Sequence, residues 1–140
     1  MAPQAHRVPG LMSDLLGWLA ATDEHPLIVS SVFHYEFEFI HPFADGNGRV
    51  GRLWQTLILS RWQPVFVDLP VESLINAHQA EYYQAIQDAT AGADSAPFIE
   101  FMLRMIQEAL EAGTPQATPQ VTPKWRGFSG RWSVNSRGMN

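Results

Sequence analysis

The segment from Pro26 to Ile40 constrains the fold of this chain more than any other. It is apolar on most faces from Leu27 onward. Val, Phe and Tyr are common over Ser31–Ile40, which is compatible with a strand, but the whole segment is long for one. A helix that is apolar nearly all round is usually a central, buried helix, and a proline suits its first turn. We therefore expect residues 26–40 to be the central helix of the fold.

Four further segments repeat apolar residues with the 3.6-residue period of an α-helix. They are residues 8–22, 47–62, 71–90 and 97–111. In residues 47–62, the predicted buried stripe consists of Val50, Leu53, Trp54, Leu57, Ile58 and Trp62. We expect residues 64–70, between two prolines, to be an extended connection and residues 91–97 to be a loop. The predicted fold class is all-α, a compact bundle of about five helices.

Composition narrows the possible functions. The 140 residues are 46% apolar, which suits one domain with a real core, and they include no cysteine. Disulfides, zinc–thiolate centres and cysteine nucleophiles are thereby excluded. No run of 18 apolar residues suggests a membrane span, and the N-terminal MAPQAHRVPG does not resemble a secretory signal. We expect a cytoplasmic protein with no membrane partner.

Charge and composition divide the chain into three parts. All 14 acidic side chains lie within residues 1–123, with only five of the nine cationic ones, which argues against a nucleic-acid-binding body. We assign residues 1–7 to an N-terminal extension and residues 8–112 to the core domain. Residues 113–140 combine three Thr-Pro pairs with basic and aromatic residues, a mixture that can bind nucleic acid. We predict a disordered linker and tail there instead.

The segment His41-Pro-Phe-Ala-Asp-Gly-Asn-Gly-Arg-Val-Gly-Arg52 carries the chemistry. Gly46 and Gly48 let the backbone approach a ligand closely at the start of a helix, where unpaired N–H groups favour an anion such as phosphate. Arg49 and Arg52 are one helical turn apart, and their guanidinium groups suit a polyphosphate.

Two further side chains complete this predicted site. Asp45 would repel bare phosphate, so its place beside the anion site suggests a divalent cation that bridges carboxylate and phosphates. His41, just outside, is the natural proton acceptor for an incoming hydroxyl. Each element alone has an ordinary explanation, because a lone His often caps a helix and Asp-Gly or Gly-x-Gly is usually a turn. The complete string is much more specific than its parts.

This string resembles the signature of the Fic (filamentation-induced-by-cAMP) domain family, His-x-Phe-x-(Asp/Glu)-Gly-Asn-Gly-Arg-x-x-Arg, at every specified position, and the resemblance extends over roughly residues 8–111. It implies an all-α protein adenylyltransferase that moves AMP from ATP to a Ser, Thr or Tyr hydroxyl of a target protein, with Mg²⁺. The implied roles are general base for His41, Mg²⁺ ligand for Asp45, and β- and γ-phosphate binding for the two arginines. Gly46, Asn47 and Gly48 would form the anion hole, with the Asn47 side chain near the α-phosphate.

The resemblance also carries expectations about regulation. Gly48 separates this chain from the Doc-like branch, which has Lys there and phosphorylates its targets. Inhibited Fic proteins pair a glutamate from an (Ser/Thr)-x-x-x-Glu-(Gly/Asn) motif with the second arginine, and this chain has no such motif. We therefore expect Arg52 to be free of a carboxylate unless a homodimer or a regulatory partner supplies one. The family's inhibitory helix and β-hairpin flap would lie upstream of Met1.

Several single residues remain open. Tyr82 and Tyr83 match the helix that borders the adenine pocket, although core packing of both is the simpler interpretation. Glu38 is either a solvated acid or a carboxylate that orients His41. We expect His34 and His78 to be core histidines, and Phe43 to anchor the loop in the core.

Three functions compete at this stage. The first is AMP transfer to a protein hydroxyl. The second is a weakly active or inactive interaction module that lacks the flap. The third is transfer of another phosphate-linked group, such as UMP, phosphocholine or phosphate. The intact His41, Asp45 and arginine set favours the first.

Overall fold

A computed structural model describes residues 3–112 of the chain, which form six α-helices and two short 3-10 helices. The predicted all-α fold class is confirmed. The elements are η1 (Ala5–Arg7), α1 (Val8–Ala21), α2 (Pro26–Ile40), α3 (Asn47–Trp62), η2 (Pro64–Val67), α4 (Val71–Ala77), α5 (Gln79–Gly92) and α6 (Ala96–Ala112).

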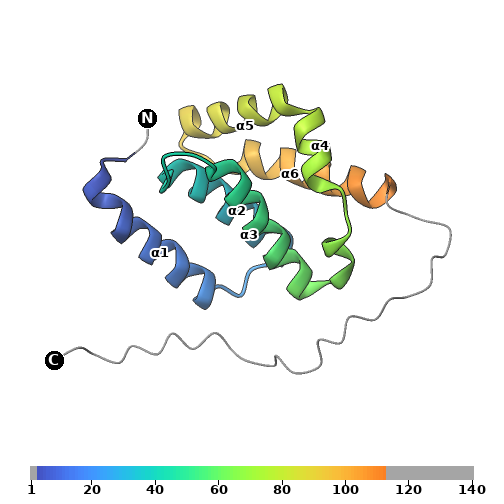
Figure 1. Cartoon of the computed structure of the whole chain (residues 1–140), viewed down its shortest axis with the longest axis horizontal. Helices are drawn as coiled ribbons and strands as arrows, with labels where there is room; N and C mark the ends of the chain where they lie inside the picture. The colour runs from blue at the N-terminus through green and yellow to red at the C-terminus, as the bar shows by residue number, and fades with distance from the viewer. Residues whose placement is uncertain (1–2, 113–140) are drawn as a thin grey trace.

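Helices α2 and α3 form a hairpin at the centre of the molecule (Figure 1). The predicted central helix is confirmed, because α2 is buried on opposite faces. One face packs Phe33 and Phe37 against Leu15 of α1 and the half-buried Trp54 of α3. Pro26 occupies the first turn, and the His25 Nδ1 atom caps the helix by accepting a hydrogen bond from the Leu27 N–H at 3.2 Å.

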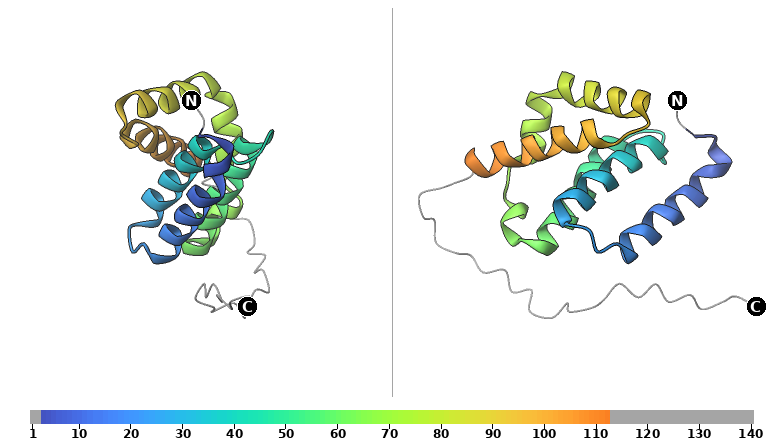
Figure 2. Two further views of the ribbon diagram at one scale, coloured as in Figure 1. Left: turned by 90° about the vertical axis from the view of Figure 1, so that its left-hand side faces the viewer. Right: turned by 180° about the vertical axis from the view of Figure 1, so that it is seen from behind.

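The opposite side of α2 is covered by α6, with α5 lying along α6 (Figure 2). Tyr35 of α2 belongs to the core on this side, together with fully buried residues of α6 such as Phe98, Met102 and Met105. The apolar repeat predicted over residues 97–111 matches this buried face of α6, although Leu110 is 41% exposed. Helix α2 therefore contributes to the two larger of the three hydrophobic clusters among the described residues.

The structure corrects two predicted elements. The helix predicted over residues 71–90 is two helices, because the backbone at His78 (φ −107°, ψ 32°) leaves the helical region between α4 and α5. Residues 64–70 are not wholly extended, since η2 occupies Pro64–Val67 and buries Phe66 against Leu59 and Ile106. Proline opens this 3-10 turn as readily as it opens an extended segment.

The predicted buried stripe of α3 is wrong in part. Leu53 is 67% exposed, whereas Leu59 and the polar Gln55 are almost completely buried. Apolar residues occur on several faces of α3, so periodicity alone did not locate the arc that packs against α2. That arc includes Gly51 and Gln55, which a count of hydrophobic residues overlooks.

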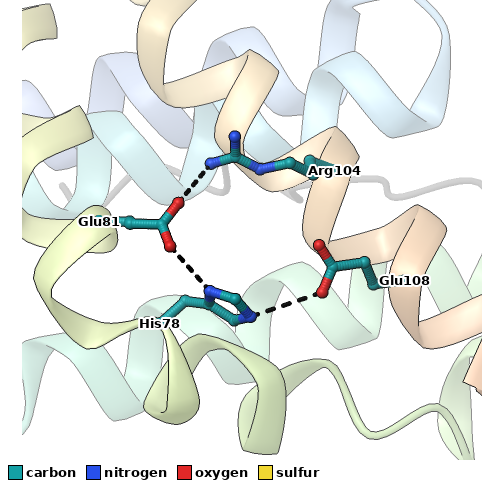
Figure 3. Close-up of polar contacts among 4 residues, drawn as sticks. All are labelled: His78, Glu81, Arg104 and Glu108. Carbon is teal, nitrogen blue, oxygen red and sulfur yellow. Dashed lines mark hydrogen bonds and ion pairs between the residues drawn. The ribbon is translucent and has the colours of Figure 1, made fainter.

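The joint between α4 and α5 is tied to α6 by charged side chains (Figure 3). His78 Nδ1 lies 2.9 Å from Glu81 Oε1 and Nε2 lies 3.5 Å from Glu108 Oε2, while Arg104 donates to Glu81 Oε2 at 2.9 Å. The expectation that His78 is a core histidine is therefore wrong. Its side chain is one-third exposed and faces carboxylates, because the chain turns away from the core at this residue.

None of the helices in residues 3–112 has the length and hydropathy needed to cross a bilayer. Part of the assigned N-terminal extension forms η1. The predicted linker and tail, residues 113–140, lie outside the described residues.

Candidate active site

The loop between α2 and α3 is closed by one asparagine. Asn47, 2% exposed, accepts a hydrogen bond from the Phe43 N–H at 2.9 Å and donates to the Phe43 carbonyl at 2.7 Å. The Phe43 ring is 52% exposed, but its centroid lies 6.2 Å from that of the buried Phe37 ring, so the predicted core anchor is confirmed in part. The Phe43 backbone is a second anchor, because both of its polar groups bind the Asn47 side chain.

Left-handed backbone conformations lie at both ends of this loop. His41, with φ 52°, ends α2 and donates its N–H to the Phe37 carbonyl, and Gly46, with φ 83°, precedes α3. A positive φ is uncommon for histidine, whereas glycine adopts it without cost. This geometry leaves the His41 side chain exposed at the loop and the first N–H groups of α3 without helical acceptors.

A pocket of about 310 Å³ lies at this end of the hairpin. All nine residues predicted for the site line it, and further lining residues come from α2, α4 and α5. The complete lining is Glu38, His41, Ala44, Asp45, Gly46, Asn47, Gly48, Arg49, Arg52, Ile75, Asn76, Gln79, Tyr82 and Tyr83.

The two arginines of the motif lie in different environments. The Arg49 side chain is 72% exposed, and its nearest carboxylate is Asp45, with Nη2 and Oδ2 3.4 Å apart. The Arg52 side chain is only 17% exposed. A Cβ added at Gly46 would lie 3.3 Å from Arg49 Nη2, and one at Gly48 would lie 3.1 Å from Arg52 Nη1. Each guanidinium therefore folds back over one glycine of the loop.

The expectation that Arg52 is free of a carboxylate is wrong. Its Nε lies 3.4 Å from Oε1 of Glu72, a residue of α4 in the same chain. Glu72 is not part of an inhibitory motif of the family. It lies in α4, outside the segment that carries the two arginines, so nothing in that segment indicates the contact. It contacts the Nε side of the guanidinium, while Nη1 lies over Gly48.

Asp45 is the one carboxylate of the motif, and its side chain is 94% exposed at the pocket rim. Within residues 3–112 no cluster of three or more His, Asp or Glu side chains could hold a metal by itself. Mg²⁺ is often held by one or two carboxylates together with substrate phosphates and water. A single accessible carboxylate beside a helix N-terminus fits that kind of binding.

The two tyrosines of α5 occupy different positions. Tyr83 is 54% exposed at the pocket, whereas Tyr82 is 3% exposed and its hydroxyl lies 3.1 Å from Nε2 of His34. His34 is completely buried, as predicted, and its Nδ1 lies 2.7 Å from Gln55 Oε1. Burial lowers the pKa of His34 to about 4, and the hydrogen bond to Gln55 opposes that shift.

Glu38 is neither fully solvated nor hydrogen-bonded to His41. It lines the pocket, and its Oε1 is buried without a hydrogen-bond partner among the described residues. Burial raises the pKa of the Glu38 carboxyl, while the charges of His41 and Arg52 act in the opposite direction. Glu38 therefore adds a carboxylate to the surroundings of both residues.

Sequence reasoning missed Asn76 and Gln79, which bring side-chain amides from α4 and α5 to the pocket. Gln79 lies four residues before Tyr83, so both side chains lie on the same face of a helix. This spacing could have indicated that Gln79 lines the pocket with Tyr83. Asn76 precedes the break at His78, and no pattern in the sequence revealed that break.

Known proteins resemble this chain in sequence and in fold. Residues 1–59 match the model of the Fic/DOC family. Proteins named Protein adenylyltransferase Fic are similar to it: one from Culex quinquefasciatus is 35% identical over 106 residues, and one from Nematostella vectensis is 34% identical over 100 residues. These matches cover 72% and 68% of this chain. The crystal structure of a Fic family protein from Desulfovibrio desulfuricans G20 superposes with a TM-score of 0.78 at 56% identity, over 86% of this chain.

A helical hairpin whose loop leads into the N-terminus of α3, with the complete motif around it, is typical of a Fic-type core. The chain belongs to the Fic/DOC family. It spans 20% of the Culex relative, 22% of the Nematostella relative and 38% of the Desulfovibrio chain.

Proposed function

We propose that this chain is the catalytic core of a protein adenylyltransferase, which transfers AMP from ATP to a hydroxyl group of a target protein. The observation that carries the proposal is the convergence of His41, Asp45, the glycine loop and both arginines on one pocket. The names of the relatives from Culex and Nematostella support the same activity.

In the proposed reaction, His41 accepts the proton of a Ser, Thr or Tyr hydroxyl as that oxygen attacks the α-phosphorus of ATP. The new P–O bond joins AMP to the target, and the bond to the β-phosphate breaks to release pyrophosphate. His41 suits this role because its imidazole is exposed beside the first turn of α3. A proton acceptor held beside the attacking group also gains from proximity.

Nucleotide binding is assigned to the rest of the pocket. The N–H groups of the first turn of α3, over Asn47, Gly48 and Arg49, face the phosphates, and Arg49 and Arg52 bind the β- and γ-phosphates. The Asn47 side chain serves by closing the loop, because both of its polar atoms bind Phe43. Asp45 would hold Mg²⁺ together with the phosphates, and the metal would neutralise phosphate charge.

The adenine end of the pocket is assigned to α5. Tyr83 is the tyrosine that can contact a base, because its ring is half exposed at the pocket. Tyr82 borders the pocket while its hydroxyl faces the core. The amides of Asn76 and Gln79 supply polar groups on the same side.

Incubation with Mg²⁺ and α-³²P-ATP, in the presence of a lysate as the source of target protein, tests the proposed transfer. Labelling of protein from α-³²P-ATP but not from γ-³²P-ATP is expected, because the γ-phosphate leaves with pyrophosphate. Labelling from the γ-position would indicate phosphate transfer, and stronger labelling from GTP, UTP or CTP would indicate another nucleotide. No labelling from any of them would favour an interaction module.

His41→Ala is the decisive variant in this assay. We expect labelling to fall by about 10²–10⁴-fold, the usual contribution of a general base, while ATP binding measured by calorimetry stays nearly unchanged. His6→Ala, at an exposed histidine of η1, is the matched control and keeps wild-type labelling. Near wild-type labelling by His41→Ala would refute the assigned role.

A further inference from the structure

Glu72 reaches the site from a helix outside the motif. It lies in the first turn of α4, and its side chain is 63% exposed. Val71 and Ile75 of the same helix are 9% and 2% exposed and pack in the hydrophobic cluster that α6 dominates. These buried residues anchor α4, so the Glu72 carboxylate extends toward Arg52 from a helix that core packing holds in place.

The contact between Glu72 and Arg52 uses one edge of the guanidinium group. Arg52 Nε donates to Glu72 Oε1 at 3.4 Å. Nη1 lies on the other edge of the planar group, 3.1 Å from the point that a Cβ on Gly48 would occupy. The guanidinium therefore presents Nη1 to the first turn of α3 while Glu72 engages Nε. One arginine can bind a carboxylate and a phosphate together in this way, because its five N–H donors form a fixed fork.

The exposed fraction of Arg52 agrees with a side chain that is held. It is 17%, against 72% for Arg49. The carboxylate partner of Arg49 is Asp45, which lies four residues before it and is itself 94% exposed. Glu72 differs because it comes from a separate helix, so its contact fixes Arg52 relative to another part of the fold.

An alternative acceptor for Arg52 lies close to Gly48. Oε1 of Glu38 is 3.5 Å from the same Cβ position, is buried, and has no hydrogen-bond partner among the described residues. A buried carboxylate oxygen without a partner is costly, so a nearby donor that turns toward it is stabilised. A guanidinium paired with Glu38 would have fewer donors left for a phosphate. The contact of Nε with Glu72 opposes that rotation.

We propose that Glu72 is a positioning residue for Arg52, and that it holds the guanidinium so that the Nη groups remain available to the β- and γ-phosphates. The inference rests on the proposed function, because it assigns polyphosphate binding to Arg52. Preorganised donors avoid the cost of ordering a long side chain when the ligand binds. A carboxylate near a polyphosphate also repels it, so the sign of the change in ATP affinity separates positioning from repulsion.

Calorimetric titration of Glu72→Ala with ATP and with AMP tests the proposal, because AMP lacks the phosphates that Arg52 would bind. We expect ATP affinity to fall by about three- to fivefold, the size of a partly exposed ion pair, and AMP affinity to stay unchanged. Glu72→Gln keeps an oxygen that can accept from Nε, so it should retain more ATP affinity than Glu72→Ala. Glu100→Gln removes the same charge from an exposed position of α6 outside the pocket lining, and as the matched control it should not lower ATP affinity.

A double-mutant comparison shows whether the effect passes through Arg52. In an Arg52→Ala background, Glu72→Ala should not lower ATP affinity further, because the guanidinium that it positions is absent. A purely structural role of Glu72 would instead weaken ATP binding equally in both backgrounds.

The outcomes distinguish the two proposals. An ATP preference over AMP that Arg52→Ala removes and Glu72→Ala leaves intact overturns the positioning role alone. A rise in ATP affinity in Glu72→Ala also overturns it, because Glu72 would then compete with phosphate for Arg52. Equal loss of ATP and AMP affinity, or an additive loss in the Arg52→Ala background, has the same meaning for the role. A wild-type protein that binds ATP no better than AMP overturns both the positioning role and the phosphate assignment on which it rests.

Discussion

At the scale of single residues, the two arginines of the motif are chemically alike but differently held. Arg49 is largely solvated and contacts the exposed carboxylate of Asp45. Arg52 is mostly buried and contacts the Glu72 carboxylate of α4. A flexible exposed side chain loses more entropy on binding than one already held, so equal contacts to phosphate need not give equal affinity.

Removal of each arginine should therefore weaken ATP binding more than AMP binding, but to different extents. A charge-assisted contact is worth about 1.5–3 kcal/mol. We expect Arg52→Ala to approach the upper end of that range for ATP, and Arg49→Ala the lower end. Calorimetric titration of both variants with ATP and with AMP measures the four changes in binding free energy relative to the wild type. Arg61→Ala, on the same helix but outside the pocket lining, is the control. Equal weakening of ATP and AMP would contradict the assigned phosphate contacts.

Much of the candidate site could be predicted from the sequence because one continuous segment supplies it. The turn formed by Gly46 and the helix that begins at Asn47 follow from local backbone chemistry. Glu72 and the inward orientation of Tyr82 could not be predicted in that way. Both depend on how α4 and α5 pack against α3, and the spacing of residues within the motif carries no information about that packing.

At the scale of helices, the contact between α2 and α3 is unusual because polar groups and a glycine lie inside it. Gly51 is buried, and the imidazole of His34 and the Glu38 carboxyl occupy the space where its side chain would be. The local cost of glycine in a helix is thereby offset by the packing that it permits. Gly17 of α1 is the contrasting case, since a Cβ there meets nothing within 4 Å.

Alanine at these two glycines should have opposite effects on stability. Gly17→Ala should raise the free energy of unfolding by about 0.5–1 kcal/mol, the gain in helix propensity at an open position. Gly51→Ala gains the same propensity but forces the fully buried His34 to move, and overpacking costs about 1–3 kcal/mol. We expect a net loss for Gly51→Ala. Urea denaturation of both variants measures the difference, and stabilisation by Gly51→Ala would contradict the close approach.

Periodicity predicted the helices better than their faces or joints. It located α2 and α6 because one is apolar nearly all round and the other has a clear stripe. It missed the break at His78 because neither proline nor glycine marks that position. It misjudged α3 because Gln55 and Gly51, the residues packed against α2, are not hydrophobic.

At the scale of the whole molecule, His34 links stability to pH. Burial holds its pKa at about 4 in the folded protein, against 6.5 when exposed. Between these values the unfolded chain binds a proton that the folded protein excludes, so stability rises with pH in this window. As pH falls from 6.5 to 4, His34 should lower the free energy of unfolding by about 3 kcal/mol.

Comparison of the wild-type protein with His34→Gln isolates this contribution. The raised pKa values of Glu36 and Glu38 oppose it, because folded carboxyl groups with raised pKa values bind protons more readily than the unfolded chain. Those carboxyl groups are present in both proteins. We expect urea denaturation at pH 7, 5.5 and 4 to give a steeper loss of stability for the wild type. Parallel curves would show that His34 does not titrate below its ordinary range in the folded state.

The break at His78 has a consequence for how this region can change in evolution. Glu72, which contacts Arg52, lies before that break, and Tyr82 and Tyr83, which line the same pocket as Arg52, lie after it. Glu108 ties the break itself to α6. The angle between α4 and α5 therefore sets where both sets of side chains lie around Arg52. An inserted or deleted residue in an α-helix turns everything beyond it by about 100°. A change of length between residues 72 and 82 would therefore move Glu72 relative to the two tyrosines without altering any residue of the HPFADGNGRVGR motif, so a relative with the motif intact can still have a different pocket wall.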